Sequence, residues 1–415
     1  MPRELRHLKT LEEAHRILWD ALPAPIRGGH FGVHAVEIAE AVGLVLEQAV
    51  ICPTDLPPFD RAIMDGYAVR AGDTFGASEG LPAYLKVVGE VRMGEAPEFA
   101  LSHQEAGAIP TGGMLPEGAD AVVMVEHTQP WGDDSIEVLR PVAPGENIVR
   151  RADDTRAGQE ILPAGHRIRP QDVSGLAGLG IEAVEVHRPR VAVLSTGSEL
   201  VPHTGDTELG RIRDMNGPAL RAAAAACGAE PVSLGLVEDD AEKIAAALRR
   251  GLDQADVVLV SGGTSVGIED VIHEIIDSLG EPGVIVHGLA LKPGKPVIIG
   301  LACGVPVFGM PGHPTSCLII FRELVAPLLG LARGEETGPP LPRKARLTRN
   351  FPSQAGREEL VPVRLEQNQG GWWATPLLTP SALISTLVRA DGLVRIPPEA
   401  EGLYSGDEVD VEPFT

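Results

Sequence analysis

The spacing of apolar residues changes several times along the chain. Residues 1–48 place apolar side chains at helical intervals, which predicts amphipathic helices at about 10–22 and 34–48. Over residues 49–155, short alternating runs such as "YLKVVGEVRMG", cut by Gly and Pro, predict a compact β-rich domain. Polar loops and a small helix at "PQDVSGLAGLGI" follow over 156–186. We therefore expect a discontinuous helical domain, formed by 1–48 and 156–186.

Residues 187–332 have a different rhythm, in which short β-branched runs alternate with helical segments. This alternation predicts a central parallel α/β sheet with helices on both faces. The run "GEETGPPLPRK" is typical of a linker, and residues 342–415 then alternate as the strands of a small β domain. The predicted fold class is α/β plus β, multidomain: a central parallel α/β domain, a β-rich domain, a discontinuous helical domain and a C-terminal β domain.

The charge of the chain limits its partners. The 415 residues carry a formal net charge of −23, which argues against non-specific binding to nucleic acid or to an anionic membrane. The cysteines are scattered without a C-x-x-C pair, which fits a reducing compartment and neither a zinc site nor a disulfide framework. The N-terminal stretch lacks the apolar core of a signal peptide, and no apolar run reaches the length of a membrane span. We expect a soluble, cytoplasmic protein.

The loops that follow the predicted parallel strands carry the polar residues of most interest. Such loops share one edge of the sheet, where α/β proteins bind ligands. The turn in "SGGTSVGIED" joins a strand to a helix, so its backbone N–H groups can face an anion, although it lacks both the dinucleotide and the P-loop signatures. The segment "LKPGKP" adds Lys292 and Lys295, two of only six lysines in the chain. Two such point charges suit a phosphate-type oxyanion.

Acidic residues fall in the same loops, namely Glu199, Asp239, Asp240 and Asp270. Carboxylates beside an anionic ligand repel it unless a hard cation lies between them, and Mg²⁺ prefers such oxygen ligands. Each acid also has a simpler structural role. Asp239 and Asp240 suit a helix N-cap, and Glu199 and Asp270 suit the first turn of a helix. The residues by themselves indicate an anion-handling, Mg²⁺-linked enzyme and leave its substrate open.

Three further features have simple structural explanations. Thr315 or Ser316 suits a helix N-cap better than a nucleophile, and His313 suits a loop position better than a base or a ligand. The stretch "IMDGYAV" at 63–69 matches a type I′ hairpin, because apolar runs flank its Asp-Gly pair. None of these features identifies a reaction.

A set of longer motifs is more specific. They are "PPFDRAIMDGYAV", "PTGGMLPEGADAVVMVE", "VLSTGSEL", "SGGTSVGIEDV", "KPGKPV", "GMPGHPTS" and "LVRADGLVRIP". In their order and spacing the chain resembles the MoeA family of molybdopterin molybdenumtransferases, which includes the E domain of gephyrin, from about residue 8 to residue 412. The resemblance implies that the central domain is of the molybdopterin-binding type.

The resemblance also implies an activity and its requirements. The enzyme would take adenylylated molybdopterin and molybdate, insert the metal at the dithiolene and release AMP, as the final step of molybdenum cofactor biosynthesis. Mg²⁺ dependence is implied, and so is an elongated homodimer whose active cleft lies between the subunits. The preceding adenylyltransferase is an implied partner. The glycine-rich turn would hold the dithiolene and phosphate end of the pterin through its backbone amides.

The family's functional positions carry over to residues of this chain. The catalytic set implied by the resemblance is Asp65, Glu199, Asp270, Lys292 and Lys295, and the metal set is Glu199, Asp270 and Asp240, with Asp239 as the alternative to Asp240. The implied substrate-binding residues are Thr111, Arg150, Arg151, Asp154, Gly262, Gly263, Thr264, Ser265, Gly267, Pro311, Gly312, His313, Pro314 and Ser385.

The chain departs from the family pattern at two places. The arginine-rich "NIRRRGED" pattern is represented by "NIVRRADD", in which Val149 replaces an arginine. The usual "PGNP" is "PGHP" here, so His313 stands in the predicted oxyanion site. Both departures concern residues that would contact an anion.

Other functions remain open at this point. The preceding molybdopterin adenylyltransferase has a domain similar to residues 187–330, although it lacks the added domains. A gephyrin-like scaffold that binds a partner peptide is a further alternative. Tungstate in place of molybdate is also open, because the two oxyanions are nearly identical in size and charge.

Overall fold

The structure, a computed structural model, describes residues 8–27, 31–262, 266–332, 341–368, 370–377 and 383–414, with the backbone alone described at 266–269 and 332. Its contacts divide the chain into two compact units. The larger unit consists of Met1–Glu47 and Val184–Thr415, and the smaller unit of Gln48–Ala183. The four domain ranges expected from the sequence stay a prediction.

The larger unit contains a sheet in the order β17-β14-β18-β22-β21-β19. Its strands are β14 (Arg190–Thr196), β17 (Glu230–Val237), β18 (Val257–Gly262), β19 (Gly283–His287), β21 (Ile298–Ala302) and β22 (Val305–Met310). Its helices are α1 (Leu11–Ala21), α2 (Ala24–Arg27), α4 (Asn216–Ala226), α5 (Ala241–Gln254), α6 (Val266–Leu279), α7 (Pro314–Ile320) and α8 (Ala326–Ala332), with a π-helical turn at Phe321–Val325.

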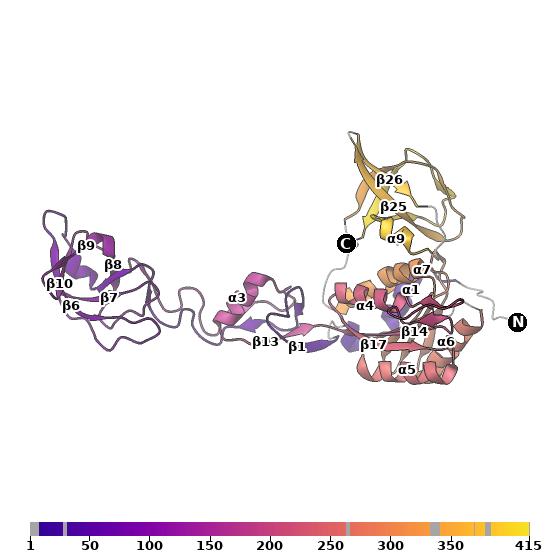
Figure 1. The fold of residues 1–415 in the computed structure, drawn as a ribbon, viewed down its shortest axis with the longest axis horizontal. Coiled ribbons are helices and arrows are strands. Elements are labelled where there is room, and N and C mark those ends of the chain that lie inside the picture. Colours follow the sequence, from indigo (N-terminus) through magenta and orange to yellow (C-terminus); the bar gives the residue numbers. More distant parts are fainter. Residues whose placement is uncertain are drawn as a thin grey trace. The chain divides into compact units, whose positions relative to one another are not determined.

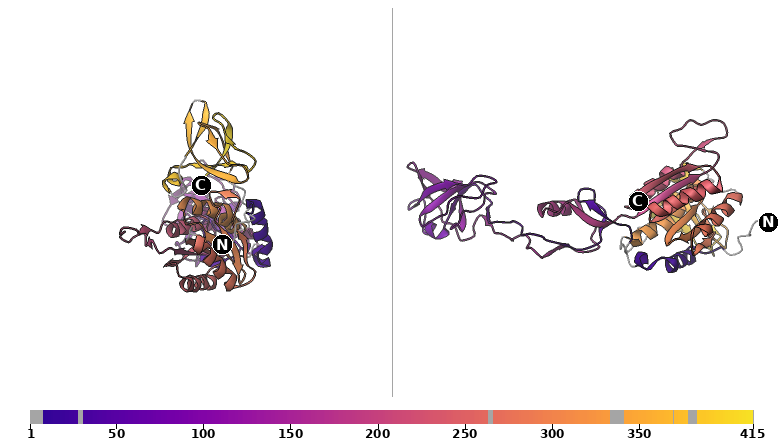
Figure 2. Two further views of the ribbon diagram at one scale, coloured as in Figure 1. Left: turned by 90° about the vertical axis from the view of Figure 1, so that its right-hand side faces the viewer. Right: turned by 90° about the horizontal axis from the view of Figure 1, so that it is seen from below.

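Helices cover both faces of this sheet, as the sequence predicts. Along β14, Val191 and Val193 pack in the core beneath α1, α4 and α7, whereas Ala192 and Leu194 pack in the core above α5 and α6. Figure 1 shows these two helical layers on either side of β14, and the left view of Figure 2 shows the same region turned by 90°. Alternating residues of one strand therefore fill two cores, which explains why these strands are continuously apolar.

The sheet is not wholly parallel, which corrects the sequence prediction. β17, β14, β18 and β22 are parallel, but β21 runs antiparallel to both β22 and β19. The reason lies in the turn Cys303-Gly304, where both residues have positive φ, 53° and 83°. Such a two-residue turn makes a tight hairpin, and a hairpin can join only antiparallel strands.

The N-terminal segment forms one of the two expected helices. α1 begins with a capping box in which the Thr10 side chain accepts from the backbone of Glu13 and the Glu13 carboxylate accepts from Thr10. The helix expected at 34–48 is wrong, because β1 (Val33–Glu37) and β2 (Val45–Leu46) form there and flank β13 (Ala183–His187). Valines favour these strands, and Gly43, at a φ of 83°, turns the chain between them.

The C-terminal segment folds as the expected β domain. Its strands are β23 (Arg343–Leu347), β24 (Phe351–Pro352), β25 (Glu358–Asn368), β26 (Gly371–Pro376), β27 (Gly392–Ile396), β28 (Gly402–Leu403) and β29 (Glu408–Pro413), with a short helix α9 (Ser385–Arg389). The sheet closes on itself because β25 pairs with both β26 and β27. Most of the predicted linker lies outside the described residues.

Two sets of contacts help to fasten this β domain to the α/β domain. The short strand β20 (Leu291–Lys292) leaves the α/β domain and pairs in parallel with β25. On β27, Arg395 donates to Glu323 of the π-helical turn through Nη2 at 2.8 Å and to Glu358 of β25 through Nη1 at 2.7 Å. The two domains of the larger unit therefore share a strand and a partly buried ion-pair network.

The segment Pro314–Leu331 corrects one expectation from the sequence. Its 18 residues form a continuous helical stretch with a mean hydropathy of 1.5, long and apolar enough by composition to cross a membrane. However, 72% of this stretch is buried within the fold, and Ile320, Leu324 and Leu328 belong to the same core as Val191 and Val193. Packing against the sheet accounts for its apolar character.

The smaller unit is β-rich, as predicted. Its main sheet has the order β8-β5-β7-β6-β10-β9, with β5 (Gly66–Val69), β6 (Ala83–Glu90), β7 (Glu105–Ile109), β8 (Ala121–Met124), β9 (Thr128–Trp131) and β10 (Ser135–Val138). Two short pairs accompany it, β4 (Arg61–Ala62) with β11 (Ile148–Val149) and β3 (Val50–Ile51) with β12 (Glu160–Leu162). The small helix expected near residue 170 is α3 (Pro170–Gly178).

The type I′ hairpin expected at 63–69 does not form. β4 pairs with β11, and β5 pairs with β7 and β8, so the strands on either side of Asp65 are not partners. Asp65 and Gly66 also lack the positive φ that this turn requires. The glycine has a different role, because a Cβ on Gly66 would collide with the carbonyl oxygen of Val123 on β8.

We expect Asp172→Asn to destabilise the smaller unit in a pH-dependent way. The guanidinium of Arg169 and the ring of His166 donate to this carboxylate and hold the pKa of Asp172 well below its usual range. Because the folded-state pKa lies below the unfolded value of about 3.9, the stabilisation is complete above that value and is lost as the pH falls through the folded-state pKa.

The measurement is urea unfolding of the wild type and the variant between pH 7 and pH 2. The difference in unfolding free energy should be largest near neutral pH and should shrink as the pH falls below about 4. A difference that is constant over this range would contradict the assigned ion pair.

Candidate functional site

The carboxyl ends of the parallel strands meet at one edge of the α/β sheet, as predicted. β14 leads to β17 on one side, and the chain then returns to β18 on the other side, so the strand order reverses between β14 and β18. Ligands in such sheets bind at this reversal. The loops after β14, β17 and β22 carry Glu199, Asp239 and Pro311, respectively, to this edge, where β18 ends at Gly262.

The two neighbouring aspartates have different roles here. Asp240 caps α5, because its Oδ1 accepts from the backbone of Lys243 at 3.0 Å, which confirms the helix N-cap interpretation for this residue. Asp239 instead ties two loops together. It accepts from Thr196 Oγ1 at 2.8 Å and from the backbone of Ser198 at 3.1 Å. Asp239 therefore fixes the loop that carries Glu199.

A buried asparagine that sequence reasoning missed joins two further loops. Asn216, at the start of α4, donates from Nδ2 to Ser261 Oγ at 2.7 Å and to the carbonyl oxygen of Gly312 at 2.9 Å. Ser261 lies at the end of β18 and Gly312 in the loop after β22. One side chain thus holds the glycine-rich turn beside the "PGHP" loop. No signal in the sequence distinguishes it from an ordinary first-turn asparagine.

The start of the glycine-rich turn is described, and its middle is not. A Cβ on Gly262 would collide with the carbonyl oxygen of Thr196, so the close approach of β18 to β14 requires a glycine there. Gly263, Thr264 and Ser265 lie outside the described residues, and Gly267 is described only as part of the backbone of α6. The predicted amide cradle therefore stays a prediction.

The predicted metal ligands do not form a cluster. Within the part of the chain that the structure describes, no three His, Cys, Asp or Glu side chains lie close enough to hold a metal ion together. Glu199 and Asp270 are both exposed. Burial and the nearby His273 lower the pKa of His287 on β19. The negative charge of Asp270 opposes this shift. The expected Mg²⁺ site of Glu199, Asp240 and Asp270 is thus not assembled by these residues alone.

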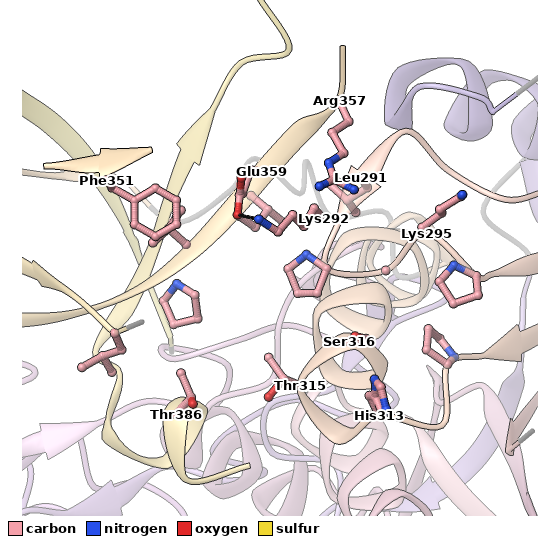
Figure 3. Close-up of a pocket in the computed structure, with 18 residues that line it drawn as sticks. Leu291, Lys292, Lys295, His313, Thr315, Ser316, Phe351, Arg357, Glu359 and Thr386 are labelled. Atoms are coloured by element: carbon pink, nitrogen blue, oxygen red, sulfur yellow. Dashed lines mark ion pairs between the residues drawn. The ribbon is translucent and has the colours of Figure 1, made fainter. Parts of the chain in front are cut away.

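The two predicted lysines line one cavity of about 500 Å³ between the α/β domain and the C-terminal β domain. Figure 3 shows Lys292 and Lys295 at its wall, with His313 across from them. Pro311 lines it as well. The cavity is also lined by residues from the C-terminal domain, including Phe351, Arg357, Glu359 and Thr386. The structure therefore brings together the "LKPGKP" and "PGHP" motifs, as predicted. The C-terminal β domain supplies a further part of the cavity wall, which was not predicted.

The cations of this cavity have unequal surroundings. Lys292 pairs with Glu359 at 2.5 Å between Nζ and Oε1, as Figure 3 shows, whereas exposed Lys295 forms no ion pair with any described residue. Arg357 donates from Nη2 to Gln354 at 3.0 Å, but its buried Nε has no partner. The guanidinium of Arg357 carries a positive charge at the cavity wall, which favours an anion there.

Sequence reasoning missed Arg357 and Glu359. They lie in the motif-poor stretch "PSQAGREELVPV", and only the pairing of β20 with β25 brings them to Lys292. The alternating pattern of residues 342–415 predicted a small β domain, but it did not indicate which strands would lie beside each other.

Four other residues near the cavity differ from expectation. Ser385 is exposed and is not among the lining residues, whereas its neighbour Thr386 is buried and lines the wall. The N-cap of α7 is His313, and not Thr315 or Ser316. Both hydroxyl residues are buried and line the cavity, and Thr315 Oγ1 donates to the carbonyl oxygen of Leu383 at 3.4 Å. His313 itself is exposed at the cavity wall.

The smaller unit gathers the remaining predicted residues. Asp65 accepts from the backbone of Thr111 at 2.7 Å, and this bond lowers the pKa of the Asp65 carboxyl. β11 brings the "NIVRRADD" segment to the same place, because Val149 pairs with Arg61 on β4. The motifs "MDGYAV", "PTGG" and "NIVRRADD", which are distant in sequence, thus meet beside the ends of β4 and β5.

The arginines of this segment are placed differently. Arg151 donates from Nε to Asp55 at 2.6 Å, and its backbone N–H donates to Asp60 at 2.7 Å, so it is held against the loop before β4. Arg150 is exposed, and its backbone donates to Asp153. Asp154 is also exposed. Of these residues, Arg150 has the side chain most available to a ligand.

Comparison with known proteins gives a consistent result over the whole chain. Residues 9–180 match the model of the MoeA N-terminal region (domains I and II), 192–330 match a probable molybdopterin-binding domain, and 344–414 match the MoeA C-terminal region (domain IV).

Individual relatives agree. Molybdopterin molybdenumtransferase 2 of Mycobacterium tuberculosis is 33% identical, over 98% of this chain and 100% of the relative. A putative molybdopterin biosynthesis protein of Methanocaldococcus jannaschii is 34% identical over 98% of both chains. The crystal structure of a molybdopterin biosynthesis MoeA protein from Pyrococcus horikoshii is 40% identical, with a TM-score of 0.79 over 99% of this chain and 100% of that one.

We expect Asn216→Ala to cost about 1–3 kcal/mol of stability, because it leaves the Gly312 carbonyl and Ser261 without their donor. Hydrogen exchange should also become faster in the segments around Ser261 and Gly312. Asn368→Ala is the matched control, since Asn368 is exposed and accepts from the backbone of the nearby Gly370, two residues along the chain. Equal effects of the two substitutions on exchange would show that Asn216 does not join the loops.

Proposed function

The chain belongs to the MoeA family, and we propose that it inserts molybdenum into adenylylated molybdopterin with release of AMP, the final step of molybdenum cofactor biosynthesis. The observation that carries this proposal is the cavity lined by Lys292, Lys295 and Arg357. Its cations are concentrated in a chain whose net charge is −23, so local side chains must hold the anionic substrate.

The cavity suits a tetrahedral oxyanion such as molybdate. Lys292 and Lys295 supply ammonium groups, and Arg357 adds the charge of its guanidinium to the wall. Thr315, Ser316 and Thr386 place hydroxyl groups on the wall. These donors require no metal, and no residue of the wall needs to act as a nucleophile. Tungstate meets the same donors, so the choice between the two metals does not follow from this wall.

The sheet edge between β14 and β18 would receive the phosphoanhydride of the pterin nucleotide. Its support is the position at the strand reversal and the fixed loops at Asp239 and Asn216. Asp65, Thr111 and Arg150 of the smaller unit would contribute in the assembled enzyme, which we propose to be a homodimer in the cytoplasm that receives its substrate from the preceding adenylyltransferase.

Mg²⁺ is part of the proposal in a limited form. The described acidic residues form no three-membered cluster, and Mg²⁺ commonly binds through one or two carboxylates together with substrate phosphates. Exposed Glu199 or Asp270 would therefore hold the ion only together with the phosphoanhydride, where the ion would offset the charge of the phosphate oxygens. No protein-only metal site is proposed.

The reaction itself gives the first test. With adenylylated molybdopterin under anaerobic conditions and Mg²⁺, we expect AMP release that depends on molybdate and leaves molybdenum on the pterin. Consumption of ATP with molybdopterin would instead identify an adenylyltransferase. Absence of both reactions would leave a gephyrin-like scaffold as the better explanation.

We expect Lys295→Met and Arg357→Met each to raise the KM for molybdate roughly tenfold or more, because each removes a charged donor to the oxyanion. Lys344→Met is the control, since Lys344 lies outside the cavity wall and pairs with Glu408 at 2.9 Å on the surface. It removes the same charge and should leave the KM within about twofold. Equal effects of all three substitutions would show that net charge, and not the cavity, controls binding.

A further inference from the structure

Glu359 is the only carboxylate among the described residues that line the cavity. It is 4% exposed, so it is a buried acid inside a site that we propose to hold a dianion. Both of its oxygens have partners. Oε1 pairs with Lys292 Nζ at 2.5 Å, and Oε2 accepts from Ser353 Oγ at 2.6 Å.

The backbone fixes this ion pair. β20 and β25 run in parallel with Lys292 and Glu359 as direct partners in the register. Two side chains on directly paired residues stay close whatever the cavity contains. The carboxylate is therefore a permanent neighbour of Lys292 and was not brought there by a flexible loop.

The consequence is a defined charge for the cavity. Lys292, Lys295 and Arg357 face one carboxylate, which leaves two positive charges before His313 is counted. These two positive charges match the two negative charges of a dianionic tetrahedral oxyanion. Without the carboxylate the site would hold three positive charges and would attract a dianion more strongly, since charges interact more strongly in a partly buried site than in water.

Strong binding of the free oxyanion is not useful to an insertase, because the metal must leave these donors for the dithiolene. Ground-state binding that is not matched in the transition state lowers KM and kcat together, because it stabilises the bound substrate alone. A carboxylate that competes for Lys292 counteracts such binding. It needs no contact with the ligand, because it holds the lysine and its own negative charge repels the anion across the cavity.

We propose that Glu359 is a positioning residue that limits the affinity of the cavity for divalent oxyanions, by holding Lys292 and by its own negative charge. This inference rests on the proposed function, since it assumes that the cavity binds molybdate. It adds a residue whose charge opposes that of the substrate and whose removal should strengthen binding.

The test is Glu359→Gln in the full-length chain, with sodium molybdate titrated calorimetrically at low ionic strength. We expect the Kd for molybdate to fall at least threefold, and the Kd for sulfate to fall as well. In the AMP-release assay, KM for molybdate and kcat should fall together. A residue that merely supports the pairing of β20 with β25 would do the opposite, so an unchanged or higher Kd overturns the proposal.

Two controls separate charge from structure. Glu358→Gln makes the same change at the adjacent residue, whose carboxylate binds Arg395 at 2.7 Å and does not line the cavity, and it should not tighten binding. Ser353→Ala removes the other partner of Glu359 and keeps its charge, so it should not tighten binding either. Tighter binding in either control contradicts the proposal.

A double variant covers the case in which Glu359→Gln does not fold. Lys292→Met should weaken molybdate binding, and adding Glu359→Gln to it should restore part of the affinity, because the uncompensated carboxylate is removed. No recovery overturns the inference. If the wild type itself binds neither molybdate nor tungstate, the oxyanion cavity is wrong, and the role of Glu359 falls with it. If the wild type binds and Glu359→Gln does not tighten, only the role of Glu359 is wrong.

Discussion

The pairing of β20 with β25 is the contact on which the cavity depends. It is short, with Leu291 and Lys292 opposite Glu358 and Glu359, yet it joins a strand from the α/β domain to the closed sheet of the C-terminal domain. Because of it, the cations of one domain and the Arg357 and Glu359 side chains of the other face the same space. The bonds from Arg395 to Glu323 and Glu358 reinforce this junction from the side of β27.

The cavity wall and the chain as a whole carry charges of opposite sign. The chain is strongly acidic, but the cavity wall is cationic, and its one carboxylate is bound to a lysine. At the sheet edge the acids are mostly engaged in structure, with Asp240 capping α5 and Asp239 tying a loop. Glu199 and Asp270 are also exposed there, and we propose that they are available to a cation brought with the substrate.

Much of this arrangement follows from the sequence, because local patterns determine it. Continuous β-branched runs, helical periodicity and strand-end loops predict the α/β domain, and the rarity of lysine directs attention to Lys292 and Lys295. The errors occur where local patterns fail. The 34–48 segment is compatible with both a helix and strands, and the antiparallel β21 depends on two positive φ angles at Cys303 and Gly304. Arg357 and Glu359 depend on a pairing between residues far apart in sequence.

The most direct measurement is the anomalous diffraction of tungstate bound in crystals of the full-length chain. Tungstate replaces molybdate with nearly the same size and charge and scatters strongly. The account predicts the main anomalous peak inside the cavity, within hydrogen-bonding distance of Lys295 and Arg357. A main peak at the sheet edge beside Glu199, with the cavity empty, would contradict it and would move the oxyanion site to the carboxyl ends of β14 and β18.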